Sequence, residues 1–92
     1  MTFDAGQAYE LHPKVAIRPE RFGGLAYHYG NRRLTFLKAQ SLVDLVRELG
    51  AYPSAREALD AHVATDRIAA DRRGAYEKAL AGLLTSEVIR VR

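Results

Sequence analysis

The sequence contains no cysteine, which excludes disulfides, metal sites built on cysteinate ligands and thiol catalysis. It also lacks any apolar run approaching the roughly 18 residues that a membrane-spanning helix needs. Its first ten residues, MTFDAGQAYE, do not show the basic-then-apolar order of a signal peptide. The default expectation is therefore a cytoplasmic protein with no membrane partner.

A strong charge of one sign is missing as well. The chain has 14 lysines and arginines against 11 carboxylates, a net charge of +3. Dedicated nucleic-acid binders concentrate basic residues on one face, whereas here only Arg32-Arg33 and Arg72-Arg73 are adjacent basic pairs. Nucleic acid is compatible with this balance without being required by it, and an acidic peptide would satisfy it equally.

With 92 residues the chain is long enough for one small domain. We expect residues 1–8, most of which are small or polar, to form a flexible N-terminus, and residues 9–92 to form a single domain. No repeat or low-complexity segment divides it.

The segment from Leu11 to Lys38 predicts three short strands with turns at glycine pairs and Gly-Asn. The expected strands are Val15–Arg18, Leu25–Tyr29 and Arg33–Leu37, with turns at Gly23-Gly24 and Gly30-Asn31. In a meander the first and third of these strands form the edges.

The two expected edges differ in proline content. Pro13 and Pro19 flank Val15–Arg18 and blunt that edge, because proline donates no ladder hydrogen bond. Arg33–Leu37 has only flanking basic charge. Such an open edge is either an aggregation hazard or a docking site for an extended peptide, and we interpret it as a docking site.

From Ser41 onward the apolar period becomes helical. A first helix is expected from Ser41 to Gly50, with Ser41 as a capping residue, and a second opens at the capping box begun by Ser54. A third is expected between about Asp66 and Leu84, where Gly74 permits either a close backbone approach or a break. The tail 88–92 has strand character and is expected to pack back as a short wing. The fold class is α+β: a three-stranded antiparallel sheet followed by three helices, resembling a winged helix–turn–helix.

No catalytic or metal site is expected. The three histidines, His12, His28 and His62, have no metal-ligand spacing, and we place His28 at the surface. Ser41 and Ser54 are placed as helix caps without a partner base. The sequence therefore predicts a protein that is not an enzyme and that carries no cofactor or metal.

For two groups of residues the sequence allows both a structural role and a role in peptide binding. The aromatic cluster around Tyr27, Tyr29 and Phe36 is expected mainly to pack across the hairpin and onto the helices. The alternative needs only main-chain atoms, with these side chains flanking an added strand. Arg72 is either an exposed surface residue or part of a helix wall beside the open edge, and Tyr76 is either core or part of that wall.

The stretch LHPKVAIRPERFGGLAYHYGNRRLTFLK closely resembles the mycofactocin-system peptide chaperones, which belong to the PqqD-like recognition elements of ribosomally made, modified peptides. The ending LLTSEVIR resembles them more loosely, and Arg67–Gly74 departs from the pattern. The resemblance implies a chaperone that binds the leader of a precursor peptide by strand addition and presents it to a radical S-adenosylmethionine maturase. It implies peptide contacts at the third strand and the last helix, namely Arg33, Leu34, Thr35, Phe36, Leu37, Lys38, Arg72 and Tyr76.

A small winged-helix DNA-binding protein is the alternative function. It would need the third helix exposed, with its basic residues clear of the sheet. Binding of an acidic leader peptide independently of DNA would favour the chaperone.

Overall fold

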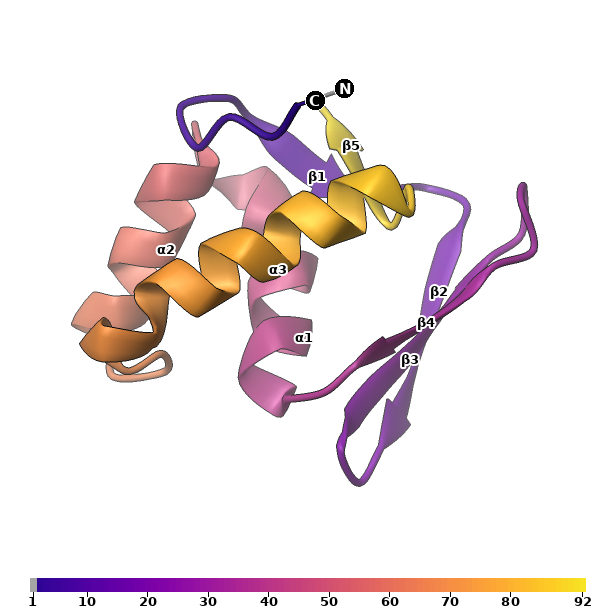
Figure 1. The fold of residues 1–92 in the computed structure, drawn as a ribbon, viewed down its shortest axis with the longest axis horizontal. Coiled ribbons are helices and arrows are strands. Elements are labelled where there is room, and N and C mark those ends of the chain that lie inside the picture. Colours follow the sequence, from indigo (N-terminus) through magenta and orange to yellow (C-terminus); the bar gives the residue numbers. More distant parts are fainter. Residues whose placement is uncertain (1) are drawn as a thin grey trace.

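The computed structural model describes residues 2–92, so Met1 of the predicted flexible N-terminus lies outside the described residues. Figure 1 shows a helical layer on one side and a sheet on the other. In chain order the elements are β1 (Tyr9–Leu11), β2 (Val15–Glu20), β3 (Gly23–His28), β4 (Leu34–Leu37), α1 (Gln40–Glu48), the 3-10 turn η1 (Leu49–Ala51), α2 (Ala55–Ala64), the 3-10 turn η2 (Ala70–Arg72), α3 (Arg73–Thr85) and β5 (Ile89–Val91).

The larger sheet is antiparallel with the order β2-β3-β4, which confirms the α+β prediction and both predicted edge strands. The predicted wing is also present: β5 pairs with β1, with Ile89 opposite Leu11 and Val91 opposite Tyr9. This pairing places β1 and β5 side by side, as Figure 1 shows.

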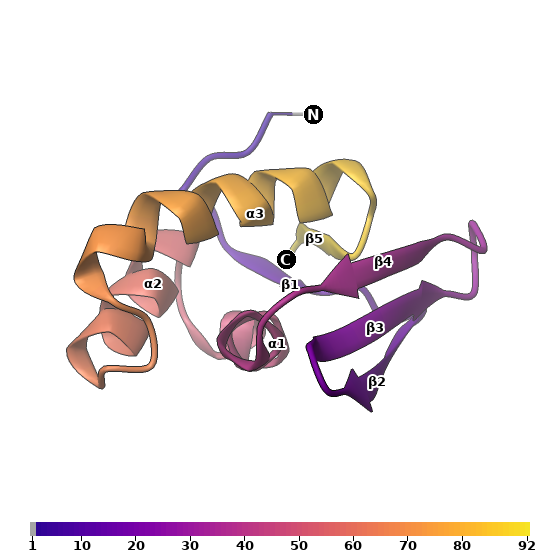
Figure 2. The same ribbon diagram turned by 60° about the horizontal axis from the view of Figure 1, so that its bottom comes forward.

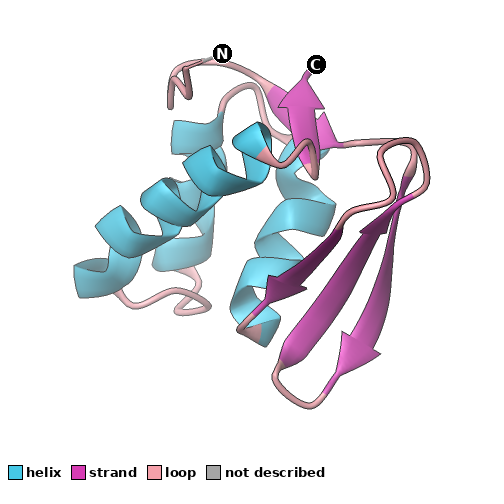
Figure 3. Ribbon diagram, turned by 45° about the vertical axis from the view of Figure 1, so that its right-hand side comes forward, coloured by secondary structure: helices cyan, strands magenta, loops and turns pink. Residues whose placement is uncertain are grey.

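The core lies between the sheet and the helices, and α1 packs directly against β3 and β4. Figure 3 shows α1 standing between the sheet and the other two helices. Alternation of side chains along a strand sends one set inward, so Ala26 of β3 and Leu37 of β4 are buried against the helical layer. From α1, Val43, Leu45 and Val46 close the same core.

The turn predicted at Gly23-Gly24 was wrong, because these glycines begin β3 and the turn is formed by Arg21 and Phe22. Close packing explains the glycines. A Cβ on Gly24 would lie 2.9 Å from Val43 Cγ2, and one on Gly23 would lie 2.3 Å from the Leu37 carbonyl oxygen. Gly23 also has φ +144°, which L side chains rarely adopt. The pair therefore lets α1 and the end of β4 approach β3.

The helix starts were predicted correctly in one case of two. Ser54 caps α2, and its Oγ accepts a hydrogen bond from the Glu57 N–H at 3.2 Å. Ser41 lies inside α1, whose N-cap is Ala39. Of the two roles considered for Gly74, close approach is wrong, since a Cβ added to this glycine would meet nothing within 4 Å. The break falls just before it, where η2 meets α3.

The segment before β1 contacts α2. The N–H groups of Ala55 and Arg56 donate to the carbonyls of Gln7 and Ala5, at 3.0 and 2.8 Å. These bonds satisfy donors that the first turn of a helix leaves unpaired. Flexibility of residues 1–8 stays a prediction. In the described residues, no helix combines the length and hydropathy needed to cross a membrane.

Candidate functional site

The phase of the β3–β4 ladder determines which backbone groups of β4 face outward. The His28 N–H donates to the Arg33 carbonyl at 3.0 Å, so these two residues form a hydrogen-bonded pair. The register continues without a bulge to Leu37. Because hydrogen-bonded and non-bonded pairs alternate in an antiparallel ladder, Thr35 and Leu37 also direct their N–H and C=O groups toward β3.

Leu34 and Phe36 consequently direct their N–H and C=O groups away from the sheet. Within residues 2–92 these four groups have no hydrogen-bond partner among the turn, loop and side-chain contacts. Figure 2 shows that β4 is the edge on the side of α3, with β2 farthest from that helix. The open backbone groups of Leu34 and Phe36 therefore lie along the sheet edge that is on the side of α3.

A groove lies between the end of β4, the start of α1 and α3. Its volume is about 150 Å³, and its lining is Lys38, Ala39, Leu42, Arg72, Ala75, Tyr76 and Ala79. The floor is apolar, and the lining contains two cations and no carboxylate. The half-buried Tyr76 ring is held in the wall by a hydrogen bond between its hydroxyl and Ser41 Oγ. The groove can accept an apolar side chain with an acidic neighbour.

The opposite edge, β2, has a ladder of the same kind. The Tyr29 N–H donates to the Lys14 carbonyl at 2.8 Å, in the register that pairs Val15 with His28. Alternation then directs the backbone groups of Val15, Ile17 and Pro19 outward.

Several of these outward groups on β2 are already used. The Val15 N–H donates to the His12 carbonyl at 3.0 Å, and the Ile17 carbonyl accepts from Arg47 Nη2 at 3.1 Å. Pro19 has no N–H, and its outward position explains how β2 runs through it to Glu20 rather than ending at Arg18 as predicted. The proline-blunted edge is thus also blunted by hydrogen bonds.

A model of the peptide chaperone MftB family matches residues 8–90 of this chain. The chain belongs to this family. Among curated relatives, the peptide chaperone MftB of Mycolicibacterium smegmatis (strain ATCC 700084 / mc(2)155) is 42% identical over 89 residues, covering 97% of this chain and 83% of the relative. The peptide chaperones MftB of Mycobacterium tuberculosis (strain ATCC 25618 / H37Rv) and Mycobacterium ulcerans (strain Agy99) are 48% and 46% identical over 56 residues, covering 61% of this chain and 51% of each relative. No solved structure matches the chain.

The resemblance to mycofactocin-system peptide chaperones is therefore confirmed. The contact residues that it implies in this MftB-family chain stay a prediction. The structure brings three of them, Lys38, Arg72 and Tyr76, into one groove. Leu34 and Phe36 lie on the open edge, whereas Leu37 is fully buried and Arg33 lies at the hairpin end, its N–H bound to Asn31 Oδ1 at 2.9 Å.

The groove's apolar floor of Ala39, Leu42, Ala75 and Ala79 was not among the predicted contacts. The helical spacing does place Ala75 and Ala79 on one stripe with Arg72 and Tyr76, at i, i+3, i+4 and i+7, so the sequence indicated the face but not its use in a groove. No sequence pattern identifies Ala39 and Leu42 as groove residues. They line the groove because α1 begins directly after the end of β4.

The aromatic cluster was partly mispredicted. Leu34 and Phe36 stand opposite Tyr27 and Leu25 across the hairpin, as expected. Their side chains, however, lie on the face of the sheet turned away from the helices, and Leu34 and Phe36 are exposed. The inward positions of β4 belong to Thr35 and Leu37, because the register leaves the other set outside.

The histidines were also partly mispredicted. His28 is buried rather than at the surface, and its Nδ1 accepts from the Gly30 N–H at 2.9 Å, which supports the hairpin turn. His62 is fully buried, and this burial lowers its pKa and favours the neutral form. Its Nε2 lies 3.4 Å from Glu48 Oε1 without a hydrogen bond. Among residues 2–92 no group of three or more His, Asp or Glu side chains is placed to hold a metal ion.

Proposed function

We propose that this chain is a peptide chaperone of mycofactocin biosynthesis. It binds the leader of a ribosomally made precursor peptide as a fourth strand on β4 and presents it to a radical S-adenosylmethionine maturase. The observation that carries the proposal is the unpaired outward backbone of Leu34 and Phe36 beside a groove with a cationic rim. Family membership supports the chaperone role.

Strand addition supplies affinity through main-chain hydrogen bonds and specificity through pockets for alternate side chains. A peptide paired with Leu34 and Phe36 directs every second side chain toward α3. There the groove provides an apolar floor and the cations Lys38 and Arg72. The leader that fits is therefore an extended segment with an apolar residue close to acidic ones.

The chain itself performs no chemistry in this proposal. Holding the leader makes the encounter between the peptide's tail and the maturase effectively intramolecular, at a millimolar-scale effective concentration for a short tether. A covalent fusion of precursor and maturase through a suitable linker should then work without this protein. A fused pair that stays inactive until the chaperone is added would show that tethering alone is inadequate.

DNA binding by a winged helix has less support from the geometry. Arg73, at the start of the would-be recognition helix, is held by Asp60 Oδ1 at 2.7 Å and donates to the Arg56 carbonyl at 3.3 Å. Arg72 lines the groove together with Lys38. The basic pair of this helix is thus not directed as a unit toward solvent.

The decisive experiment is a titration of the isotopically labelled chain with the precursor leader, with amide chemical shifts mapped. We expect the largest changes at Leu34 and Phe36 and along the groove, and small ones at Ile17 on the opposite edge. Duplex DNA added as a competitor should leave these shifts in place. Shifts concentrated on β2, or displacement of the peptide by DNA, would contradict the proposal.

A further inference from the structure

The outer face of the three-stranded sheet, the one turned away from the helices, is apolar and uncovered. Four of its large side chains are strongly exposed: Phe22 at 43%, Tyr29 at 63%, Leu34 at 60% and Phe36 at 61%. Leu25 and Tyr27 lie between them, half-buried. We call these six residues the outer face. Contiguous exposed apolar patches on small soluble domains commonly mark interaction sites.

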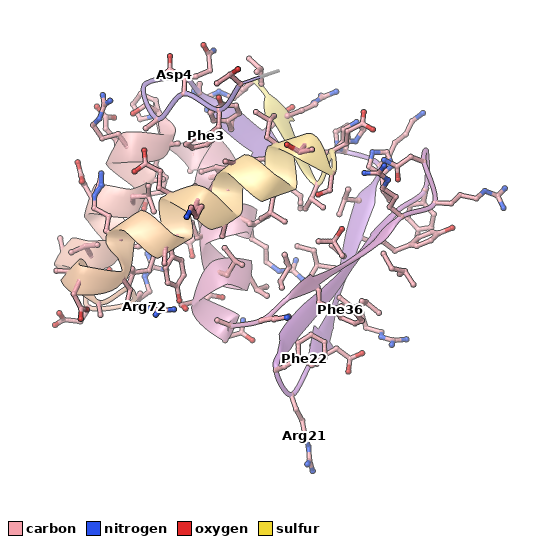
Figure 4. The ribbon with its side chains drawn as sticks, in the orientation of Figure 1. Phe3, Asp4, Arg21, Phe22, Phe36 and Arg72 are labelled. Carbon is pink, nitrogen blue, oxygen red and sulfur yellow. The ribbon has the colours of Figure 1, made fainter. Side chains whose placement is uncertain are left out.

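The outer face is ordered rather than a scatter of loose side chains. Phe22 and Phe36 meet edge to face with ring centroids 5.7 Å apart, and Tyr27 and Tyr29 do the same at 4.9 Å. Figure 4 shows Phe22 and Phe36 together at the end of the sheet where the turn between β2 and β3 lies. Arg21 projects beyond them from the same turn. Two shallow hollows, of about 450 Å³ between Leu25 and Leu34 and about 360 Å³ at Phe22 and Phe36, cross this face. Aromatic residues beside such hollows are the kind that contribute most to protein interfaces.

Positive charge borders the outer face at the end that carries the β2–β3 turn. Arg21 is exposed there, and Lys38 borders the hollow at Phe22 and Phe36. Arg18 is also exposed, but it is paired with Glu20 at 2.8 Å, so these two charges offset each other. A second copy of the chain placed face to face would bring like charges together. The chemistry therefore fits a different protein, with an apolar patch bordered by carboxylates.

The outer face is continuous with the proposed peptide site. A strand added to β4 directs one set of side chains into the groove and the other set onto the same face as Leu34 and Phe36. The bound peptide would widen the face from three strands to four. A protein seated there would touch the chaperone and the peptide together.

We infer that the outer face is the docking surface for the maturase, and that peptide and maturase bind with positive coupling through it. This inference rests on the proposed function. Because part of the maturase's contact surface is the peptide itself, the leader must raise the affinity of the chaperone for the maturase. By linkage, the maturase must raise the affinity for the leader by the same factor.

The test measures affinity for the mycofactocin-system maturase, with and without saturating leader, by calorimetry on the full chain. Phe22→Ser and Arg21→Glu alter the outer face at the turn, and neither residue is a proposed peptide contact. The Phe22 ring does touch that of Phe36, but the proposed contact of Phe36 with the leader is made by its outward backbone groups, which Phe22→Ser leaves in place. Matched controls are Val91→Ser, an exposed apolar residue on β5, and Lys78→Glu, the same charge change on α3. We expect Phe22→Ser to weaken maturase binding roughly tenfold or more, Arg21→Glu to weaken it severalfold, and both to keep wild-type melting temperature and leader affinity. The controls should bind as wild type, and leader should tighten wild-type binding severalfold.

Each other result overturns the inference in a recognisable way. Wild-type maturase affinity in both outer-face variants would remove the docking surface and leave the proposed peptide site intact. Equal loss of leader affinity would assign the outer face to the peptide instead. Self-association of the wild-type chain that Phe22→Ser abolishes would assign it to a second copy. A wild-type chain that binds neither leader nor maturase would remove the proposed function and this inference together.

Discussion

The two edges of the three-stranded sheet differ in how much of their outward backbone is already used. On β2, Val15 donates to a neighbouring carbonyl, Ile17 accepts from Arg47 and Pro19 has no donor at all. On β4, the outward groups of Leu34 and Phe36 have no such partner among the described residues. Natural sheets usually block exposed edges, so leaving one edge open while three devices occupy the other indicates that the open edge has a use.

The comparison also separates two kinds of position on β4. Thr35 and Leu37 belong to the fold, because their backbone groups pair with β3 and their side chains face the helices. Leu34 and Phe36 belong to the surface in both respects. Substitutions at Thr35 and Leu37 should therefore change the stability of the fold, whereas substitutions at Leu34 and Phe36 should change binding.

The largest effect is expected from Thr35→Pro. The Thr35 N–H faces Ala26, so proline removes a ladder hydrogen bond and leaves a carbonyl of β3 without its donor. We expect a loss of roughly 2–3 kcal/mol in the free energy of unfolding, measured by urea denaturation. Thr35→Val keeps the N–H and should retain most of the stability. A Thr35→Pro variant of normal stability that has lost only leader binding would contradict this assignment. It would mean that Thr35, and not Phe36, directs its N–H outward.

The next largest effect is expected from Phe36→Pro. Its N–H faces outward, so the fold should keep its stability while leader affinity falls at least about tenfold, or about 1.4 kcal/mol. Fluorescence anisotropy with labelled leader measures this. Ile17→Pro removes an outward N–H on the opposite edge and should leave affinity unchanged, and Phe36→Ala shows how much belongs to the side chain. Wild-type affinity in folded Phe36→Pro would rule out strand addition at this residue.

A smaller effect is expected from the basic residues near the open edge. Exposed ion pairs contribute below about 1 kcal/mol each and are screened by salt. Arg33→Ala, Lys38→Ala and Arg72→Ala should therefore each weaken leader binding less than about fivefold. Lys78→Ala, an exposed residue of α3 that does not line the groove, should leave leader binding unchanged. Titrations at low and high salt should show moderate weakening, and an affinity independent of salt would contradict a role for charge in docking.

Much of this architecture was predictable because it depends on short-range patterns. Glycine, asparagine and proline positions predicted a three-stranded meander and its two edges, and the spacing of apolar residues predicted three helices. The capping motif at Ser54 also worked, since a cap is local.

The errors share one cause, which is that they depend on contacts between distant segments. Gly23 and Gly24 resemble a turn, but their smallness serves the approach of α1 and the end of β4. Ser41 resembles a cap, but its hydroxyl bonds Tyr76 on another helix. The outward set on β4 could not be chosen from the sequence, because either parity of a four-residue strand places one leucine inside.

The last prediction concerns the blocked edge and asks whether open backbone alone is enough. The double variant Pro19→Val, Arg47→Ala supplies an outward N–H on β2 and frees the Ile17 carbonyl. Open backbone now exists on both edges, but the Val15 N–H stays bound to His12 and the groove of Lys38, Arg72 and Tyr76 remains beside β4. We expect leader stoichiometry, measured by calorimetry, to stay near one, with only weak self-association of the variant in sedimentation at high concentration.

A second leader site of similar affinity would mean that the backbone edge decides binding and the groove contributes little. If neither a second site nor self-association appears, the blocking contacts on β2 have no measurable role in protecting that edge, and the selectivity for β4 must come from the groove.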